Sequence, residues 1–283
     1  FRSGSFTAPP QIQKSITIYG AGYEADDETA TDVTYVPGIS IGKTDTVKNV
    51  HIEGIRFTGD IFLANGTQVK GLELVKCYIQ GNLQIYGEGT SLFEQIIVDQ
   101  CVFTGGIYRY GYTAAKVYNL LLQNCYLSNI GGGFTDDSTI KADHCILSNT
   151  LYYSTTNNNY LYTNCIFARN SNDQTRHCIT GTYATIKNCL YSTSSTLNNG
   201  VTTENLYTAS LTEFFTDGED GVYSPERTFT LANADEWVGT DGTEVGIHGG
   251  NGFSKVPSTP VVKSLGLEVD GRQLKVTYDA VVR

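Results

Sequence analysis

Residues 120–127 read LLLQNCYL, and residues 160–167 read YLYTNCIF. Both segments carry apolar residues five and three positions before a cysteine and again two positions after it. The pattern recurs at intervals of 20 to 24 residues, so the position of the cysteine defines an anchor column along the chain. Seven residues fill this column: Ile55, Cys77, Cys101, Cys125, Cys145, Cys165 and Cys189.

Each repeat is expected to contain two bends. A spacing of two within each pair of apolar positions indicates short strands, whereas the step of three between the pairs breaks the alternation and requires a turn. The residue before the anchor is Gly, Asn or His in five of the seven repeats, and the residue four after it is Gly or Asn in five. Gly and Asn enter left-handed backbone conformations at low cost, so both positions are predicted to be bends. His144 is expected to be such a turn residue, with local hydrogen bonds.

Two bends in a repeat of this length describe a coil. Coils of this kind stack so that the strands of neighbouring coils run parallel, about 4.8 Å apart. A leucine-rich repeat would instead contain a helical segment in each repeat, and a propeller would need about 40 residues for each blade. The sequence therefore predicts an all-β parallel solenoid in which the cysteines are free thiols that fill one column of the core.

The strand ends Asn124–Leu127 and Asn164–Phe167 resemble the right-handed parallel β-helix repeats of the pectin-lyase-like superfamily. The segment SITIYGAGY at 15–23 is similar to the first coil of such proteins, and residues 211–250 look like their closing coil, with Glu244 and His248 in place of the usual Asp and Tyr. The resemblance covers about residues 12–253 and implies a secreted or surface-displayed bacterial protein. It implies no single activity, because the superfamily contains lyases, hydrolases, epimerases and adhesins.

The tail differs from the repeats. Leu265, Leu267 and Val269 alternate with other residues, 270–271 supply a two-residue turn, and the alternation then resumes, which is typical of a β-hairpin. We expect residues 1–253 to form the right-handed parallel β-helix and residues 254–283 a hairpin that packs on the solenoid, where it would cover unpaired strand edges.

Composition restricts the partners. The net charge of −10 and the lack of a Lys/Arg cluster argue against nucleic acid, and no apolar run approaches the roughly 20 residues that span a bilayer. The chain contains no Met, which indicates a mature or trimmed fragment. We expect a monomer that is secreted or held at the outer cell surface.

The long connections after the anchor strands are the expected binding surface, because insertions from successive coils lie on one face of a solenoid. Two of them are rich in tyrosine, and an aromatic shelf suits the apolar faces of sugar rings. The predicted ligand-binding residues are Tyr108, Arg109, Tyr110, Tyr112, Tyr152 and Tyr153. The leading prediction is a non-catalytic protein that binds a polysaccharide or glycan.

Two alternatives stay open. The first is a polysaccharide lyase or glycoside hydrolase, for which the candidate catalytic residues are Asp136, Asp137, Asp173 and Arg176. Resemblance to the superfamily implies Ca²⁺ for a lyase and paired Asp carboxylates for a hydrolase; for the non-catalytic protein no cofactor or metal is expected. The second alternative is a rigid spacer that holds another module.

Overall fold

The computed structural model describes residues 3–7, 11–25, 32–42, 46–87, 90–111, 113–135, 137–149, 151–152, 159–169, 177–180, 184–197, 201–218, 220–258, 261–270 and 273–281. For 151–152, 159, 177–180, 196, 261–270 and 273–281 the description is limited to the backbone.

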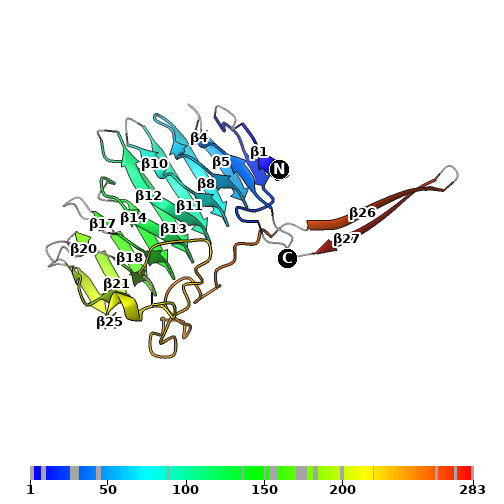
Figure 1. Ribbon diagram of the computed structural model, residues 1–283. Helices are drawn as coiled ribbons and strands as arrows, with labels where there is room; N and C mark the ends of the chain where they lie inside the picture. The colour runs from blue at the N-terminus through cyan, green and yellow to red at the C-terminus, as the bar shows by residue number, and fades with distance from the viewer. Residues whose placement is uncertain are drawn as a thin grey trace.

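Parallel strands stack into a β-solenoid, as the repeat predicted (Figure 1). One sheet has nine strands, one from each coil along its length. In spatial order these are β2 (Ile16–Tyr19), β5 (Thr46–Glu53), β8 (Gln68–Val75), β11 (Leu92–Asp99), β13 (Lys116–Gln123), β15 (Thr139–Asp143), β18 (Asn159–Thr163), β21 (Ala184–Lys187) and β24 (Thr202–Glu204).

A second sheet has 13 strands and forms further faces of the coils. Its main path is β1 (Gly4–Ser5), β3 (Thr34–Val36), β6 (Arg56–Phe57), β9 (Tyr78–Ile79), β12 (Val102–Tyr110), β14 (Tyr126–Ile130), β16 (Ile146–Leu147), β19 (Ile166–Phe167), β22 (Leu190–Ser192) and β25 (Tyr207–Ala209). A branch of this sheet contains β4 (Ile39–Ile41), β7 (Ile61–Leu63) and β10 (Leu83–Tyr86), which joins β12. A third sheet contains β17 (Leu151–Tyr152), β20 (His177–Thr180) and β23 (Thr196–Leu197).

The predicted apolar columns form the core. All seven anchor residues are at most 1% exposed, and the columns five and three positions before them are buried in every repeat. The six cysteines of the column are free, as expected. Each thiol lies near the carbonyl two residues earlier, with Cys125 Sγ 3.0 Å from Gln123 O. Cys178 lies outside the column, and its side chain is outside the described part of the chain.

The residue before the anchor is left-handed in all seven repeats, with φ between 47° and 70°. This includes Lys76 and Gln100, where the residue type had given no signal. Asn205 has φ 49° and precedes Leu206, which packs on the core in an eighth repeat. The sequence search missed this repeat because Thr203 and Thr208 stand where the other repeats carry apolar residues three before and two after the anchor.

The prediction of a left-handed bend four residues after the anchor was wrong. Gly59, Gly81 and Gly105 do not have positive φ. They are needed because successive coils approach closely: a Cβ on Gly105 would lie 2.3 Å from the carbonyl oxygen of Gly81, and one on Gly59 would lie 2.5 Å from that of Pro37. Glycine is required here by space between coils, not by a left-handed turn.

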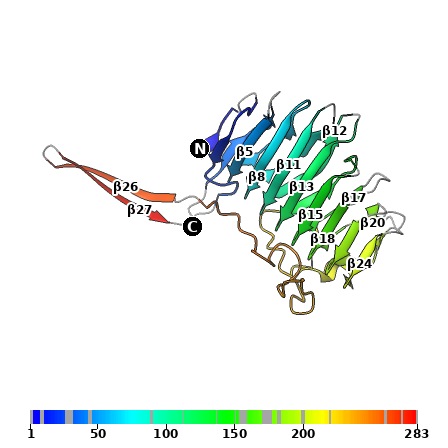
Figure 2. The same cartoon turned by 180° about the vertical axis from the view of Figure 1, so that it is seen from behind.

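The prediction that residues 211–250 form the closing coil was also wrong. Residues 211–258, which we call the strap, begin with the 3₁₀ helix η1 (Leu211–Glu213) next to β25 and run back along the outside of the solenoid towards its first coils (Figures 1 and 2). The physical reason is a second apolar column one position after the anchor, which points away from the interior. Residues of this column form a buried cluster with Phe214, Phe215, Phe229, Leu231, Trp237, Val245 and Ile247 of the strap.

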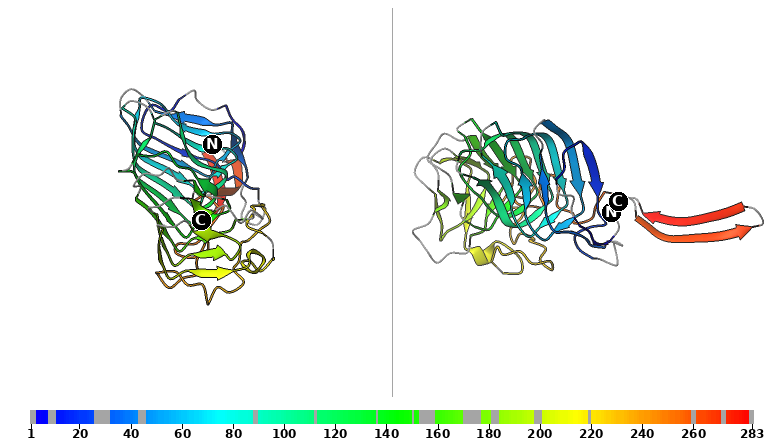
Figure 3. Two further views of the ribbon diagram at one scale, coloured as in Figure 1. Left: turned by 90° about the vertical axis from the view of Figure 1, so that its left-hand side faces the viewer. Right: turned by 90° about the horizontal axis from the view of Figure 1, so that it is seen from above.

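The tail forms the predicted hairpin, β26 (Val261–Asp270) and β27 (Gln273–Val281). Asp270 pairs with Gln273, so the two-residue connection is 271–272 and not the expected 270–271. Because the strap returns to the first coils, the hairpin starts beside the N-terminal end of the solenoid, and it extends away from the coils (Figure 3). The expected packing of the hairpin on the solenoid stays a prediction.

Candidate functional site

An aromatic surface lies on the outward face of β7, β10 and β12. In these strands Ile61, Leu83 and Ile107 point into the core, and the residues that follow them face outwards because side chains alternate along a strand. The outward residues that form the surface are Phe62, Gln84, Tyr86, Tyr108 and Tyr110. Parallel pairing places Phe62, Gln84 and Tyr108 side by side, and it places Tyr86 beside Tyr110.

The rings of this surface contact one another edge to face. The ring centroids of Tyr86 and Tyr110 are 4.6 Å apart with an interplanar angle of 63°, and those of Phe62 and Tyr110 are 6.2 Å apart at 84°. Tyr110 is 46% exposed, which makes it one of the few large apolar side chains open to solvent among the described residues. Tyr108 lies over Gly131, where a Cβ would be 2.6 Å from its ring.

Only part of the predicted tyrosine shelf can be placed. Tyr108 and Tyr110 share this surface, whereas Arg109 lies between them on the opposite side of β12. Its side chain covers Gly133, and its guanidinium Nη1 donates to the carbonyl of Thr113 at 3.3 Å. Tyr112 and Tyr153 lie outside the described residues, and of Tyr152 only the backbone is described.

The sequence reasoning missed Phe62, Gln84 and Tyr86. A usable signal was present, because Phe62, Gln84 and Tyr108 each stand seven residues after an anchor, and Tyr86 and Tyr110 stand nine after. Extending the repeat alignment beyond the anchor strand would have placed these residues in two adjacent columns.

Of the four predicted catalytic residues, the structure describes only Asp137; Asp136, Asp173 and Arg176 lie outside the described residues. The exposed Asp137 carboxylate accepts hydrogen bonds from the hydroxyls of Thr135 and Tyr118. These hydrogen bonds, first that of Thr135 and then that of Tyr118, lower the pKa of Asp137, so the group is held as a carboxylate. Among the described residues, no group of three His, Cys, Asp or Glu side chains could hold a metal ion, and no helix is long and apolar enough to cross a membrane.

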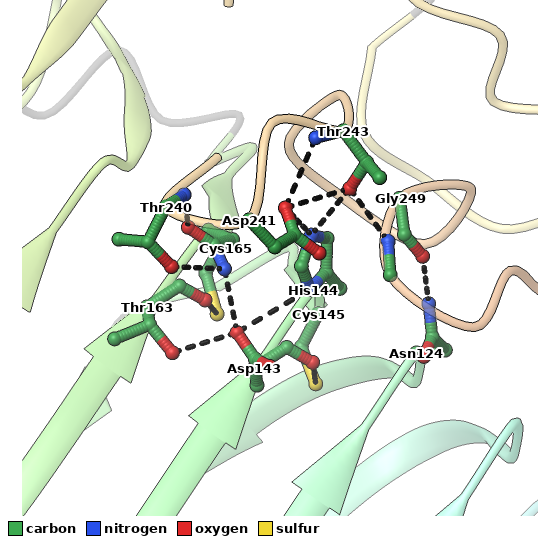
Figure 4. Close-up of polar contacts among 12 residues, drawn as sticks. Asn124, Asp143, His144, Cys145, Thr163, Cys165, Thr240, Asp241, Thr243 and Gly249 are labelled. Carbon is green, nitrogen blue, oxygen red and sulfur yellow. Dashed lines mark hydrogen bonds and ion pairs between the residues drawn. The ribbon is translucent and has the colours of Figure 1, made fainter. Parts of the chain in front are cut away.

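A second cluster of polar side chains joins the solenoid to the strap (Figure 4). Its members are six of the seven left-handed residues before the anchors, all except Gly54, and they point at the strap from successive coils. Their partners run in the reverse order of the chain: Lys76 contacts Ser258, Gln100 contacts Ser254, Asn124 contacts Ile247 and Gly249, His144 contacts Thr243, Asn164 contacts Thr240, and Asn188 contacts Val238. We call this set the polar ladder.

His144 is the histidine of the polar ladder and is 2% exposed. Its Nδ1 lies 3.3 Å from Asp143 Oδ1, and its Nε2 lies 3.2 Å from Thr243 Oγ1 and 3.6 Å from Asp241 Oδ1. The expected turn conformation is confirmed, but its partners include residues of the strap almost a hundred positions away. An Asp–His–Thr series could activate a nucleophile, yet the Thr243 hydroxyl already contacts Asp241 Oδ1 at 2.9 Å and accepts from the Gly250 amide at 2.7 Å. The arrangement is that of a structural junction.

The charges of this junction depend on one another. Burial of the imidazole opposes its protonation, but the hydrogen bond and negative charge of Asp143, with the charge of Asp241, outweigh burial and raise the pKa of His144. Burial raises the pKa of Asp143, but hydrogen bonds from His144, Thr163 and Asn164 outweigh burial and lower that pKa overall. Burial likewise opposes ionisation of Asp241, and hydrogen bonds from Thr243 outweigh it and lower that pKa.

Replacing His144 by Asn is expected to remove a pH-dependent part of the stability. A group whose pKa is raised on folding stabilises the fold below its unfolded pKa, about 6.5 for His, and loses that contribution as the pH rises through its folded pKa. The stability advantage of the wild type over His144→Asn should therefore shrink as the pH is raised above about 6.5. Denaturant unfolding of both proteins at several pH values measures this difference in the free energy of unfolding. Asn fits the left-handed turn, as Asn124 and Asn164 show; an advantage that grows with pH would contradict the assignment.

Comparison of the chain with protein families, with curated proteins and with solved structures gave no match.

Proposed function

We propose that this protein is a non-catalytic, carbohydrate-binding protein of the cell exterior, and that the aromatic surface on β7, β10 and β12 is its glycan-binding site. The observation that carries the proposal is the exposed ring of Tyr110 beside Tyr86 and Phe62. Apolar faces of sugar rings pack on aromatic rings, and a few polar groups then select the orientation of the sugar.

The polar groups needed for such selection are present on the same surface. Gln84 is half-buried between Phe62 and Tyr108, and its amide offers both a donor and an acceptor to sugar hydroxyls. The phenol groups of Tyr86, Tyr108 and Tyr110 are further hydrogen-bonding groups on this surface. With a net charge of −10, the chain favours a neutral glycan over an anionic one.

The secreted or cell-surface setting rests on the resemblance of the repeats to the pectin-lyase-like superfamily. That relationship is part of the proposal, and the parallel β-solenoid supports it at the level of the fold. The lyase or hydrolase alternative stays a prediction, since three of its four candidate residues lie outside the described part of the chain.

Tyr110→Ala is expected to weaken glycan binding at least about tenfold, because truncating a central aromatic contact typically costs more than about 1.4 kcal/mol. A glycan array on the wild type, with and without Ca²⁺, finds the ligand, and titration of that glycan gives the ratio of affinities. Tyr19→Ala is the matched control, since Tyr19 is 42% exposed but lies on β2, in the other large sheet.

Equal loss of binding in the two variants would show that the aromatic surface is not the glycan-binding site. Release of unsaturated or reducing-end products from the glycan would instead identify an enzyme, and would contradict the non-catalytic assignment.

A further inference from the structure

In the part of the chain that the structure describes, the N-terminal end of the solenoid is open and apolar. A cavity of about 510 Å³ lies there, lined by Ile16, Ile18, Val36, Ile39, Ile52 and Phe57 among others. β2 is the last strand of the nine-stranded sheet at this end. Two of the exposed large apolar side chains of the described residues belong to β2, Ile16 at 36% and Tyr19 at 42%. An open end of this kind leaves core residues and a strand edge in contact with water.

The hairpin β26–β27 has one apolar face. Directly opposed residues of an antiparallel pair share a face, and the faces alternate along the strands. The register places three wholly apolar pairs on one face: Leu265 with Tyr278, Leu267 with Val276, and Val269 with Leu274. The other face carries the pairs Gly266 with Thr277, Glu268 with Lys275, and Asp270 with Gln273. An isolated two-stranded hairpin is marginal in water, so an apolar face of this length needs a surface to cover.

The strap places the start of the hairpin next to the open end of the solenoid. Its last described residues are attached to the first coils, where the Ser258 amide donates to Glu53 Oε1 and Pro257 lies against Gly54. Glu53 and Gly54 directly follow Ile52, which lines the open cavity. The hairpin begins at Val261, three residues after Ser258, and Figures 1 and 3 show it leaving the molecule beside the N-terminal end.

The geometry points to the hairpin β26–β27 as the cover of the open N-terminal end of its own solenoid. In this closed arrangement, the apolar face of the hairpin would lie over the cavity beside β2, and its polar face would be turned to solvent. The extended arrangement in the structure and the closed one differ by a rotation of the hairpin about its junction with the strap. The segment that covers the cavity is thus part of the same chain, because the strap runs from the last coil back to the first and places the hairpin there.

Hydrogen exchange of the full chain tests this closure with two neighbouring substitutions. Val276→Asp places a charge on the apolar face, whereas Thr277→Asp places the same charge on the polar face next to it. We expect the amides of β2 to exchange at least about tenfold faster in Val276→Asp and at the wild-type rate in Thr277→Asp. Unchanged exchange of β2 in both variants overturns the proposal.

A reciprocal variant covers the case in which Val276→Asp also unpairs the hairpin. Ile16→Ser alters the cavity at a partly exposed position, and the expected result is faster exchange of the amides of β26 and β27. Wild-type exchange of the hairpin in that variant overturns the proposal. A wild-type dimer that Val276→Asp converts to a monomer, measured by light scattering after size exclusion, also overturns it, because the hairpin would then cover a second copy.

Discussion

Asn164→Ala is expected to lower the free energy of unfolding by about 3 kcal/mol. Asn164 is 2% exposed and has φ 57°. Its side-chain Nδ2 donates to Asp143 Oδ1 at 2.9 Å and to Thr240 Oγ1 at 3.2 Å, and its side-chain Oδ1 accepts from the Thr240 backbone amide at 2.7 Å. Leaving such buried groups without a partner costs about 1–3 kcal/mol, and alanine in a left-handed conformation adds about 1–2 kcal/mol.

The backbone part of this loss can be measured separately. Asn205 adopts the same left-handed conformation, with φ 49°, but its side chain is exposed in the last coil. Asn205→Ala should therefore cost only about 1–2 kcal/mol. Denaturant unfolding of the two variants gives the difference; equal losses would mean that the contact of Asn164 with the strap adds nothing to stability.

Gly249→Ala is expected to cost about 3 kcal/mol and to loosen the strap. Gly249 is buried where the strap crosses His144. A Cβ at this position would lie 1.8 Å from the carbonyl oxygen of Glu244 and 2.3 Å from Cδ2 of His144. Both neighbours are held in place, because Glu244 is part of the strap backbone and His144 is fixed by Asp143 and Thr243. Overpacking a site that cannot yield typically costs about 1–3 kcal/mol, occasionally more.

Gly242→Ala is the matched control on the same strap. Gly242 has φ 82°, yet a Cβ there would meet nothing within 4 Å, so only backbone strain of about 1–2 kcal/mol is expected. Unfolding experiments and hydrogen exchange across residues 211–258 measure the two effects. If Gly249→Ala is as stable as the wild type and its strap amides stay protected, the close crossing at His144 is not required.

The coil architecture could be predicted from the sequence because it depends on local rules repeated many times. Apolar positions at a spacing of two, interrupted by one left-handed residue, define a strand, a bend and a second strand without knowledge of the remaining chain. Seven aligned copies then leave stacking as the way to bury every copy of the pattern. Leu206 shows the limit of this reasoning, since its repeat carries Thr203 and Thr208 in two of the apolar columns and was not recognised, although its left-handed residue and its packing follow the same rule.

The candidate glycan site was predicted in part. Tyr108 and Tyr110 were identified by their residue type, but their neighbours Phe62 and Tyr86 come from other coils, up to about 48 residues earlier in the sequence. Arg109 was assigned to the same surface by proximity in sequence, and alternation along β12 places it on the other side. Which side chains share a surface depends on register between coils as well as on residue type.

By itself the sequence determined the period of the coils, the buried columns and the left-handed turn before each anchor, because these follow from side-chain alternation and backbone sterics over a few residues. Only the tertiary structure decided the path of residues 211–258 and the end of the solenoid at which the hairpin emerges. A segment without a period has no local rule to place it. Its position is set by long-range burial against the column after the anchors and by hydrogen bonds from Asn124, Asn164 and Asn188, whose partners lie 50 to 125 residues away.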